Sequence, residues 1–272
     1  MKRENLIAQI RQKESFLCIG LDTDPSKIPT SLGKGPEAIL AFNRAIIDAT
    51  RDLCVSYKIN TAFYEAMGSS GWNILEQTAS LIPDSHLRIA DAKRGDIGNT
   101  TRQYAKAFFE NMDFDAVTLH PYMGKDSIEP FLNYTDKWAI ILALTSNISA
   151  DDFETLELKQ HEGRLYEQVI RLSSSWGNSS NTMFVTGATR AEELQKIRKI
   201  VPDHFLLVPG VGEQGGSLED VWKYGNNKDC GLLVNVSRAI IYAGNGIDFA
   251  EKARSAALGY QSAMKLLLQH ND

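Results

Sequence analysis

Short apolar runs rich in β-branched residues recur along the chain, and longer amphipathic stretches separate them. The runs occupy residues 16–22, 54–60, 86–93, 116–122, 138–147, 182–188, 205–212 and 231–241. Such an alternation of strand-like and helix-like segments is typical of right-handed βαβ units, which build a parallel sheet. Because about eight runs are present, the pattern favours an α/β fold of the closed (β/α)8 type, the TIM barrel, over an open doubly wound sheet.

The length of the chain suits one large domain. Its 272 residues match an α/β barrel, which needs about 250 residues. No linker, repeat or low-complexity tract interrupts the series, so we expect a single domain over residues 1–272. An N-terminal helix is expected at about 2–14. The longest connection, about 148–181, carries its own helical pattern and is interpreted as an elaborated βα segment.

The composition argues against several kinds of partner. The net charge is −5 and no run of basic residues is present, so we expect no nucleic-acid partner. No apolar stretch reaches the roughly 18 residues of a membrane-crossing helix, and the first residues lack the apolar core of a signal peptide. The cysteines Cys18, Cys54 and Cys230 lie far apart without CxxC spacing, which favours buried thiols in a reducing compartment. We therefore expect a cytoplasmic protein with no membrane partner.

Nearly every run begins with apolar residues and ends with polar ones. Examples are LD at the end of the first run, YKIN at the end of the second and LTSN at the end of the fifth. All carboxyl ends of the strands in a parallel barrel meet at one mouth, where the active sites of this architecture lie. The pattern therefore predicts a ligand site at that mouth.

The sharpest cluster of polar residues surrounds the third run. Asp91 and Lys93 are two residues apart, so on a strand they share a face, and Asp96 follows in the turn. Lys58 ends the second run in the same way. Ammonium and carboxylate groups gathered at one mouth suit proton transfer by a lysine. A purely structural ion-pair network at the barrel rim is the alternative interpretation.

A second cluster has the character of a phosphate site. The Gly-rich stretch 209–216, PGVGEQGG, includes Gly212 and Gln214, and Ser237 and Arg238 are expected at the end of the last strand. Glycines let backbone amides approach an anion, and arginine offers a bidentate fork. Loops after strands seven and eight are the usual phosphate site of such barrels. A tight turn without a ligand is the alternative for the glycines alone.

The histidines give a weaker signal. His120 is expected at the end of the fourth strand and could be catalytic, although a lone histidine at a strand end more often has a structural hydrogen-bonding role. The other histidines show no metal-ligand spacing, so no metal site is predicted.

These motifs together resemble those of the orotidine 5′-monophosphate decarboxylase family, in its longer bacterial form. The resemblance covers about residues 16–242. Where many such members have KPN, this chain reads YKIN, so the turn after Lys58 is expected to differ. The matching elements, in chain order, are Lys58, DAKRGDIGNT (91–100), LALTSN (142–147), PGVGEQGG (209–216) and NVSR (235–238).

The resemblance implies roles for the residues of one subunit. Asp22 and Lys58 would hold the ribose hydroxyls, Lys93 would be the general acid, and Asp91 would lie beside the substrate carboxylate. Thr145 or Ser146 would meet the pyrimidine amide.

The resemblance also implies a homodimer with composite active sites. Asp96 and Thr100 would come from the partner subunit. Gln214 and Arg238 would bind the phosphate, and the 209–216 loop would close as a lid.

The implied reaction is the decarboxylation of orotidine 5′-monophosphate to uridine 5′-monophosphate without a cofactor. Loss of CO2 leaves a carbanion at C6 of the pyrimidine, which Lys93 would stabilise and then protonate. The nearest alternative is a Mg²⁺-dependent sugar-phosphate enzyme such as 3-hexulose-6-phosphate synthase or 3-keto-L-gulonate-6-phosphate decarboxylase. Those enzymes place a carboxylate where this chain has Lys58. A catalytically inactive nucleotide-binding barrel and a scaffold protein are more remote alternatives.

Overall fold

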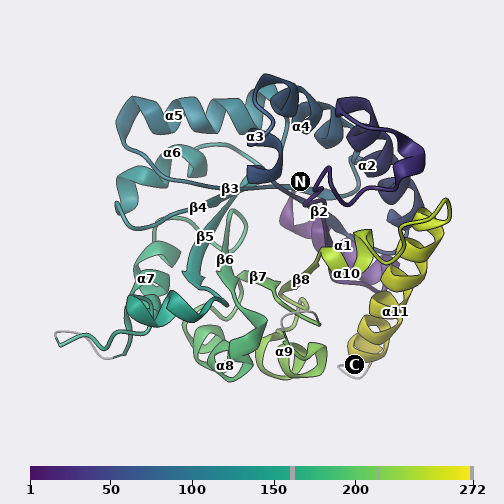
Figure 1. Ribbon diagram of the computed structural model, residues 1–272. Coiled ribbons are helices and arrows are strands. Elements are labelled where there is room, and N and C mark those ends of the chain that lie inside the picture. The colour runs from purple at the N-terminus through teal and green to yellow at the C-terminus, as the bar shows by residue number, and fades with distance from the viewer. Residues whose placement is uncertain (160–162, 213–214, 270–272) are drawn as a thin grey trace.

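The computed structural model describes residues 1–159, 163–212 and 215–269. Within these residues, eight parallel strands form a closed barrel in chain order, and helices surround it (Figure 1). The predicted (β/α)8 fold is therefore confirmed. The strands are β1 (Leu17–Gly20), β2 (Ser56–Asn60), β3 (Leu87–Arg94), β4 (Ala116–Leu119), β5 (Trp138–Leu144), β6 (Thr182–Thr186), β7 (Phe205–Pro209) and β8 (Leu232–Val236).

The strands are buried on both faces. Every residue of β1, β4, β6 and β8 is buried, as expected where helices cover a parallel barrel from outside and side chains fill it from inside. The apolar, β-branched composition of the runs follows from this double burial. The barrel closes where β8 pairs with β1, with Cys18 opposite Asn235.

The amphipathic stretches form the outer helices. The last of them, α11, packs against α2, α10 and β1 and completes the ring. The helices are α1 (Arg3–Lys13), α2 (Pro36–Thr50), α3 (Ala62–Glu65), α4 (Ser69–Leu81), α5 (Gly98–Lys106), α6 (Glu129–Leu132), α7 (Leu165–Ser174), α8 (Ala191–Ile200), α9 (Leu218–Gly225), α10 (Arg238–Ile241) and α11 (Phe249–Gln269), with shorter 3-10 or π turns η1 (Thr30–Leu32), η2 (Ala107–Asn111), η3 (Lys125–Ser127), η4 (Ile148–Asp152) and η5 (Ala188–Arg190).

Helix α1 lies at the amino-terminal ends of the strands. Arg3 pairs with Asp229 at 3.1 Å, and its guanidinium lies over the ring of Phe205, the first residue of β7. The indole of Trp138, the first residue of β5, donates to the carbonyl of Met1. This helix therefore covers the face of the barrel opposite to the predicted mouth.

The last apolar run, 231–241, contains a strand and a helix, and the strand ends slightly before the predicted end at Arg238. Strand β8 ends at Val236, and the segment from Arg238 to Ile241 is helix α10. The amides of Ile240 and Ile241 donate to the carbonyl of Ser237, which starts a helical turn. A short apolar stretch such as RAII has no period that separates a strand from a buried helix. Arg238 therefore follows the strand on a helix.

The long connection after β5 begins with η4, continues through a bridge between Glu157 and Arg164, and reaches α7; residues 160–162 lie outside the described part. The cysteines Cys18, Cys54 and Cys230 are free and buried, as the composition suggested. None of the helices in the described ranges combines the length and the apolar character that a bilayer crossing requires.

Candidate active site

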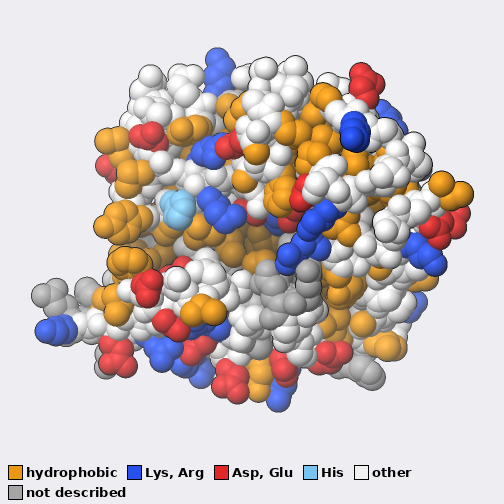
Figure 2. Space-filling model, in the orientation of Figure 1, with side chains coloured by type: hydrophobic (Ala, Val, Ile, Leu, Met, Phe, Trp, Pro, Cys, Tyr) orange, Lys and Arg blue, Asp and Glu red, His pale blue; other side chains and the backbone are white. Residues whose placement is uncertain are grey.

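A cavity of about 410 Å³ opens at the carboxyl ends of the strands. Leu142, Val185 and Leu207 contribute its apolar lining. Figure 2 shows the mouth as a hollow with apolar side chains at its bottom and basic side chains on its rim. The predicted site residues that line it are Asp22, Lys58, Asp91, Lys93, Thr145, Ser146, Ser237 and Arg238.

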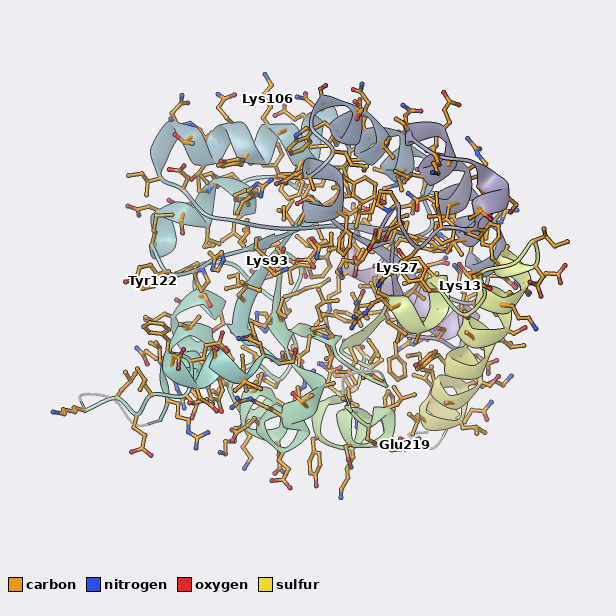
Figure 3. The ribbon with its side chains drawn as sticks, viewed as in Figure 1. Lys13, Lys27, Lys93, Lys106, Tyr122 and Glu219 are labelled. Carbon is orange, nitrogen blue, oxygen red and sulfur yellow. The ribbon has the colours of Figure 1, made fainter. Side chains whose placement is uncertain are left out.

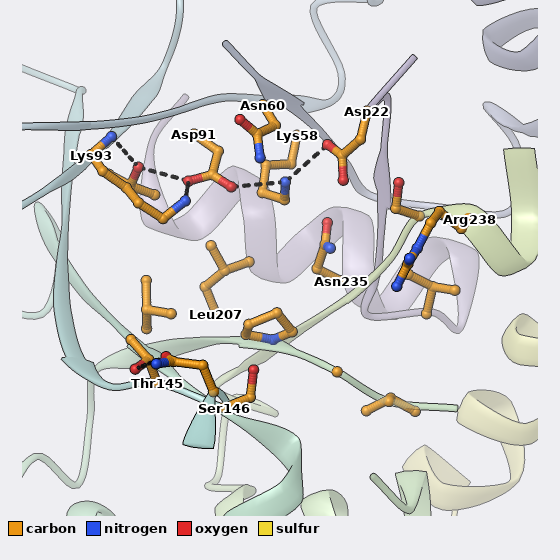
Figure 4. A pocket seen from close by; sticks show the side chains of 18 of the residues that line it. Asp22, Lys58, Asn60, Asp91, Lys93, Thr145, Ser146, Leu207, Asn235 and Arg238 are labelled. Atoms are coloured by element: carbon orange, nitrogen blue, oxygen red, sulfur yellow. Dashed lines mark hydrogen bonds and ion pairs between the residues drawn. The ribbon is translucent and has the colours of Figure 1, made fainter. Parts of the chain in front are cut away.

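Charges of alternating sign run along one wall of this cavity (Figure 4). The Nζ atom of Lys93 donates to Oδ1 of Asp91 at 2.5 Å. The other oxygen of Asp91 accepts from Nζ of Lys58 at 3.0 Å, and Lys58 also donates to Asp22 at 3.3 Å. The four side chains come from β3, from β2 and from the segment after β1, and strand β2 pairs with both β1 and β3. The network is therefore a direct product of strand order.

The network sets the charge state of its buried members. Burial alone would lower the pKa of Lys58, but the carboxylates of Asp22 and Asp91 outweigh burial and raise it above its ordinary value. Burial would likewise raise the pKa of Asp91, but the ammonium groups of Lys58 and Lys93 hold it below its usual range. Each group thus favours the ionised form of its neighbour.

Lys93 occupies an unusual backbone conformation. Its φ is 46°, in the left-handed region that side chains other than glycine rarely adopt. The pairing of β3 with β4 shifts register between Ala90 and Arg94, so β3 is irregular at this point. The Asp91 and Lys93 side chains contact each other as predicted, but the irregular backbone at Lys93 contributes to this contact as well as the alternation of side chains along a strand. An outlier at a polar cavity wall is typical of a functional position.

Thr118 on β4 completes the network and was not identified from the sequence. Its hydroxyl accepts the backbone N–H of Lys93 at 2.9 Å and donates to Oδ1 of Asp91 at 3.0 Å. It is buried and lines the cavity. A polar residue inside the apolar run 116–122 was the only sequence signal. Asn60 and Asn235, at strand ends, also line the cavity.

Arg94 lies within the DAKRGD motif but serves the fold. Its guanidinium pairs with Glu65 and lies over the rings of Tyr104 and Phe108 at 5.5 and 5.6 Å. These contacts hold α3, α5 and η2 against the end of β3. Arg94 does not line the cavity described above.

Arg238 and Ser237 line the end of the cavity away from Lys93 (Figure 4). The Ser237 hydroxyl donates to the carbonyl of Gly20 at 3.0 Å. Gly212 has a φ of 79°, and a Cβ at this position would lie 2.7 Å from the hydroxyl of Tyr260, so the loop requires glycine there. Gly212 itself does not line the cavity. The predicted residue Gln214 lies outside the described residues.

Two predicted residues and His120 lie away from the cavity lining. Asp96 is half-buried and accepts the amide of Ile97, and Thr100 is exposed on α5. His120 is exposed and does not line the cavity, so the structure gives no support for a catalytic role. In the described ranges, no group of three or more His, Cys, Asp or Glu side chains is arranged to hold a metal ion.

The sequence profile of the orotidine 5′-phosphate decarboxylase / HUMPS family matches residues 15–253. The chain belongs to this family. The family resemblance predicted from the motifs is thereby confirmed, and the matched region contains every residue of the cavity wall.

Individual members of the orotidine 5′-phosphate decarboxylase / HUMPS family resemble the chain over almost its whole length. The orotidine 5′-phosphate decarboxylase of Flavobacterium johnsoniae is 58% identical over 97% of both chains. That of Christiangramia forsetii is 56% identical with the same coverage. Because both proteins align with 97% of this chain, the similarity covers the barrel and its loops alike.

Solved structures of the family share the architecture. A putative orotidine-monophosphate decarboxylase from Toxoplasma gondii superposes with a TM-score of 0.88 at 34% identity, covering 99% of this chain and 98% of its own. The OMP decarboxylase of Leishmania donovani gives a TM-score of 0.85 at 32% identity, covering 98% of this chain and 99% of its own. The order of strands and helices is thus that of known family members.

Proposed function

We propose that this protein decarboxylates orotidine 5′-monophosphate to uridine 5′-monophosphate without a cofactor. The observation that carries the proposal is the alternating order Lys93, Asp91, Lys58 and Asp22 along one wall of a cavity that Arg238 also lines. Such a wall can meet a pyrimidine nucleotide along its length, with ring and phosphate at opposite ends.

In the proposed reaction, the bond between C6 and the carboxylate breaks and CO2 leaves. The electron pair stays at C6, where the ammonium of Lys93 stabilises the developing charge and then donates a proton. Lys93 is left neutral and regains a proton from water. Asp91 holds Lys93 at 2.5 Å and would lie beside the substrate carboxylate.

The rest of the nucleotide would bind along the remaining wall. Lys58 and Asp22 would contact the ribose hydroxyls. Arg238 would bind the phosphate as a bidentate partner, and Ser237, Gly212 and Gln214 are proposed to assist it. Phosphate binding far from C6 would contribute to the rate by ordering the site around the ring.

We further propose a homodimer in which Asp96 and Thr100 complete the partner's site. Support comes from exposed apolar side chains beside the Lys93 end of the cavity. Tyr122 is 95% exposed, and Ile97 and Met123 are exposed near it in the loops after β3 and β4. Tyr122 lies at the edge of the face that carries Lys93 (Figure 3). Exposed apolar groups next to a polar site are typical of an interaction surface.

The deciding experiment uses purified protein treated with EDTA. Orotidine 5′-monophosphate is added without metal or cofactor, and the loss of its ultraviolet absorbance is followed while uridine 5′-monophosphate is identified by chromatography. We expect turnover at the same rate with and without EDTA. Turnover that requires Mg²⁺, or none at all with the nucleotide, would overturn the proposal and favour the sugar-phosphate chemistry of similar barrels.

A further inference from the structure

The wall opposite the charged network is a turn held from outside the barrel. Thr145 and Ser146 follow β5 and line the cavity across from Lys93 and Asp91 (Figure 4). Glu154, in the long connection after β5, reaches back to this turn. One of its carboxylate oxygens accepts the Thr145 amide at 2.7 Å, and the other accepts the Thr145 hydroxyl at 2.9 Å.

A second element holds the same turn from its other side. The amide of Gly187, just after β6, donates to the carbonyl of Leu144 at 2.8 Å. A Cβ at Gly187 would lie 2.8 Å from the Cα, Cβ and N of Ser146, closer than real Cβ contacts allow. Only glycine lets β6 approach so closely, and the turn is therefore fixed between Gly187 and Glu154.

The segment that carries Glu154 is itself tied to the end of β6. Asp151 in η4 pairs with Arg190 at 2.8 Å and accepts the hydroxyl of Thr155 at 3.1 Å. The amide of Arg190 donates to the carbonyl of Gly187. The connection after β5 and the loop after β6 thus form one hydrogen-bonded unit around the turn.

The contacts of Glu154 also decide which groups of the turn can serve a ligand. A threonine hydroxyl has one proton, and that of Thr145 lies 2.9 Å from Glu154 and 2.6 Å from the amide oxygen of Asn147. The backbone amide of Thr145 already donates to the Glu154 carboxylate as well. The hydroxyl proton and the amide of Thr145 are therefore committed to the turn, which carries Ser146 next to Thr145 at the cavity lining.

We infer that Glu154 is a positioning residue, which fixes the turn 145–147 so that Ser146 can meet the amide edge of the pyrimidine. This inference rests on the proposed function, because it takes a pyrimidine nucleotide as the ligand. It assigns a role to the connection after β5, which lies outside the charged network.

The test compares two ligands in matched variants. Uridine 5′-monophosphate carries the pyrimidine, and ribose 5-phosphate lacks it. Glu154→Ala should weaken uridine 5′-monophosphate about tenfold or more, the scale for losing a hydrogen bond to a charged group. The same variant should leave ribose 5-phosphate binding within about twofold. Asp152→Ala removes an exposed carboxylate from the same segment and should change neither affinity.

Glu154→Gln provides a second, gentler variant if the alanine protein does not fold. Its single carbonyl can accept only one of the two Thr145 bonds, so its loss of nucleotide affinity should be smaller but again confined to uridine 5′-monophosphate. In both variants, KM for the nucleotide should rise more than kcat falls.

Equal weakening of both ligands, or unchanged affinity for uridine 5′-monophosphate, would overturn the inference. The wild-type protein separates this result from failure of the proposed function. If the wild type turns over orotidine 5′-monophosphate and the Glu154 variants bind both ligands with wild-type affinity, only the role of Glu154 is wrong. If wild type binds no pyrimidine nucleotide, both proposals fall.

Discussion

The hydroxyl of Thr118 on β4 accepts the backbone amide of Lys93 on β3 at 2.9 Å. The same hydroxyl donates to Asp91 at 3.0 Å, so one buried side chain fixes both the irregular backbone and the carboxylate that holds the lysine. The position of the proposed acid thus depends on the neighbouring strand.

Thr118→Val should therefore impair the chemical step. Valine keeps the shape of threonine, but it leaves the Lys93 amide without this acceptor and removes the hydrogen bond to the Asp91 carboxylate. We expect kcat to fall about tenfold to a hundredfold, the kinetic equivalent of a lost hydrogen bond to a charged group. Thr118→Ser, which keeps the hydroxyl, is the control and should retain most activity. Equal kcat in the valine variant and wild type would show that Thr118 has no positioning role.

Replacing the proposed acid should separate catalysis from binding. Lys93→Ala should lower turnover by about a thousandfold or more, because both the proton and the charge at C6 are lost. Binding of uridine 5′-monophosphate should stay measurable by calorimetry. Lys106→Ala is the control, since Lys106 is exposed on α5 and points away from the cavity (Figure 3). Near-normal turnover of Lys93→Ala would refute the assignment.

The phosphate end of the cavity can be tested with ligands that differ by the phosphate alone. Arg238→Ala should weaken uridine 5′-monophosphate by about 1.5–3 kcal/mol and leave uridine unaffected. Arg238→Lys should recover part of the loss, because an ammonium keeps the charge without the bidentate fork. If Arg238→Ala binds the nucleotide as tightly as wild type, the phosphate lies elsewhere.

The pKa of Asp91 predicts how stability changes with pH. In the folded protein this pKa lies below that of an unfolded aspartate, about 3.9. The ionised form therefore contributes stability that is present above that value and is lost as pH falls through the folded pKa. The free energy of unfolding of wild type should exceed that of Asp91→Asn most at neutral pH, and the difference should shrink below about pH 4. Urea denaturation at a series of pH values measures it, and a constant difference would contradict the expectation.

The composite site can be tested by mixing two inactive variants. If Asp96 serves the partner's site, a dimer of one Lys93→Ala subunit and one Asp96→Asn subunit contains one intact site. Random exchange of equal amounts should then restore about a quarter of wild-type activity, because half the dimers are mixed and each has one working site. Each variant alone is the baseline. A mixture no more active than its parents would mean that each subunit builds its site alone.

Much of the cavity could be predicted from the sequence because the barrel forces strand ends together. Lys58, Lys93 and Arg238 lie far apart in the chain, yet each lies near the carboxyl end of a strand, and parallel strands bring such positions to one mouth. The predicted strands agree with the observed ones except near their ends, where the run after Val236 becomes helix α10.

Other features had no sequence signal strong enough to find them. Thr118 is one threonine in an apolar run, and threonine is common in strands. Glu154 lies in a connection without a motif, and its contact with Thr145 depends on how that connection folds back. The left-handed backbone of Lys93 could not be foreseen, because lysine has no preference for that region.

The backbone angle of Lys93 means that stability and catalysis favour different residues at position 93. Glycine or asparagine would adopt a φ of 46° at lower cost than lysine does. If a library that varies position 93 is selected for thermal stability alone, variants with glycine or asparagine there should be enriched. Those variants would be more stable but would lack the proposed general acid. An engineer seeking a tougher variant should hold this position fixed and look for improvements elsewhere in the barrel.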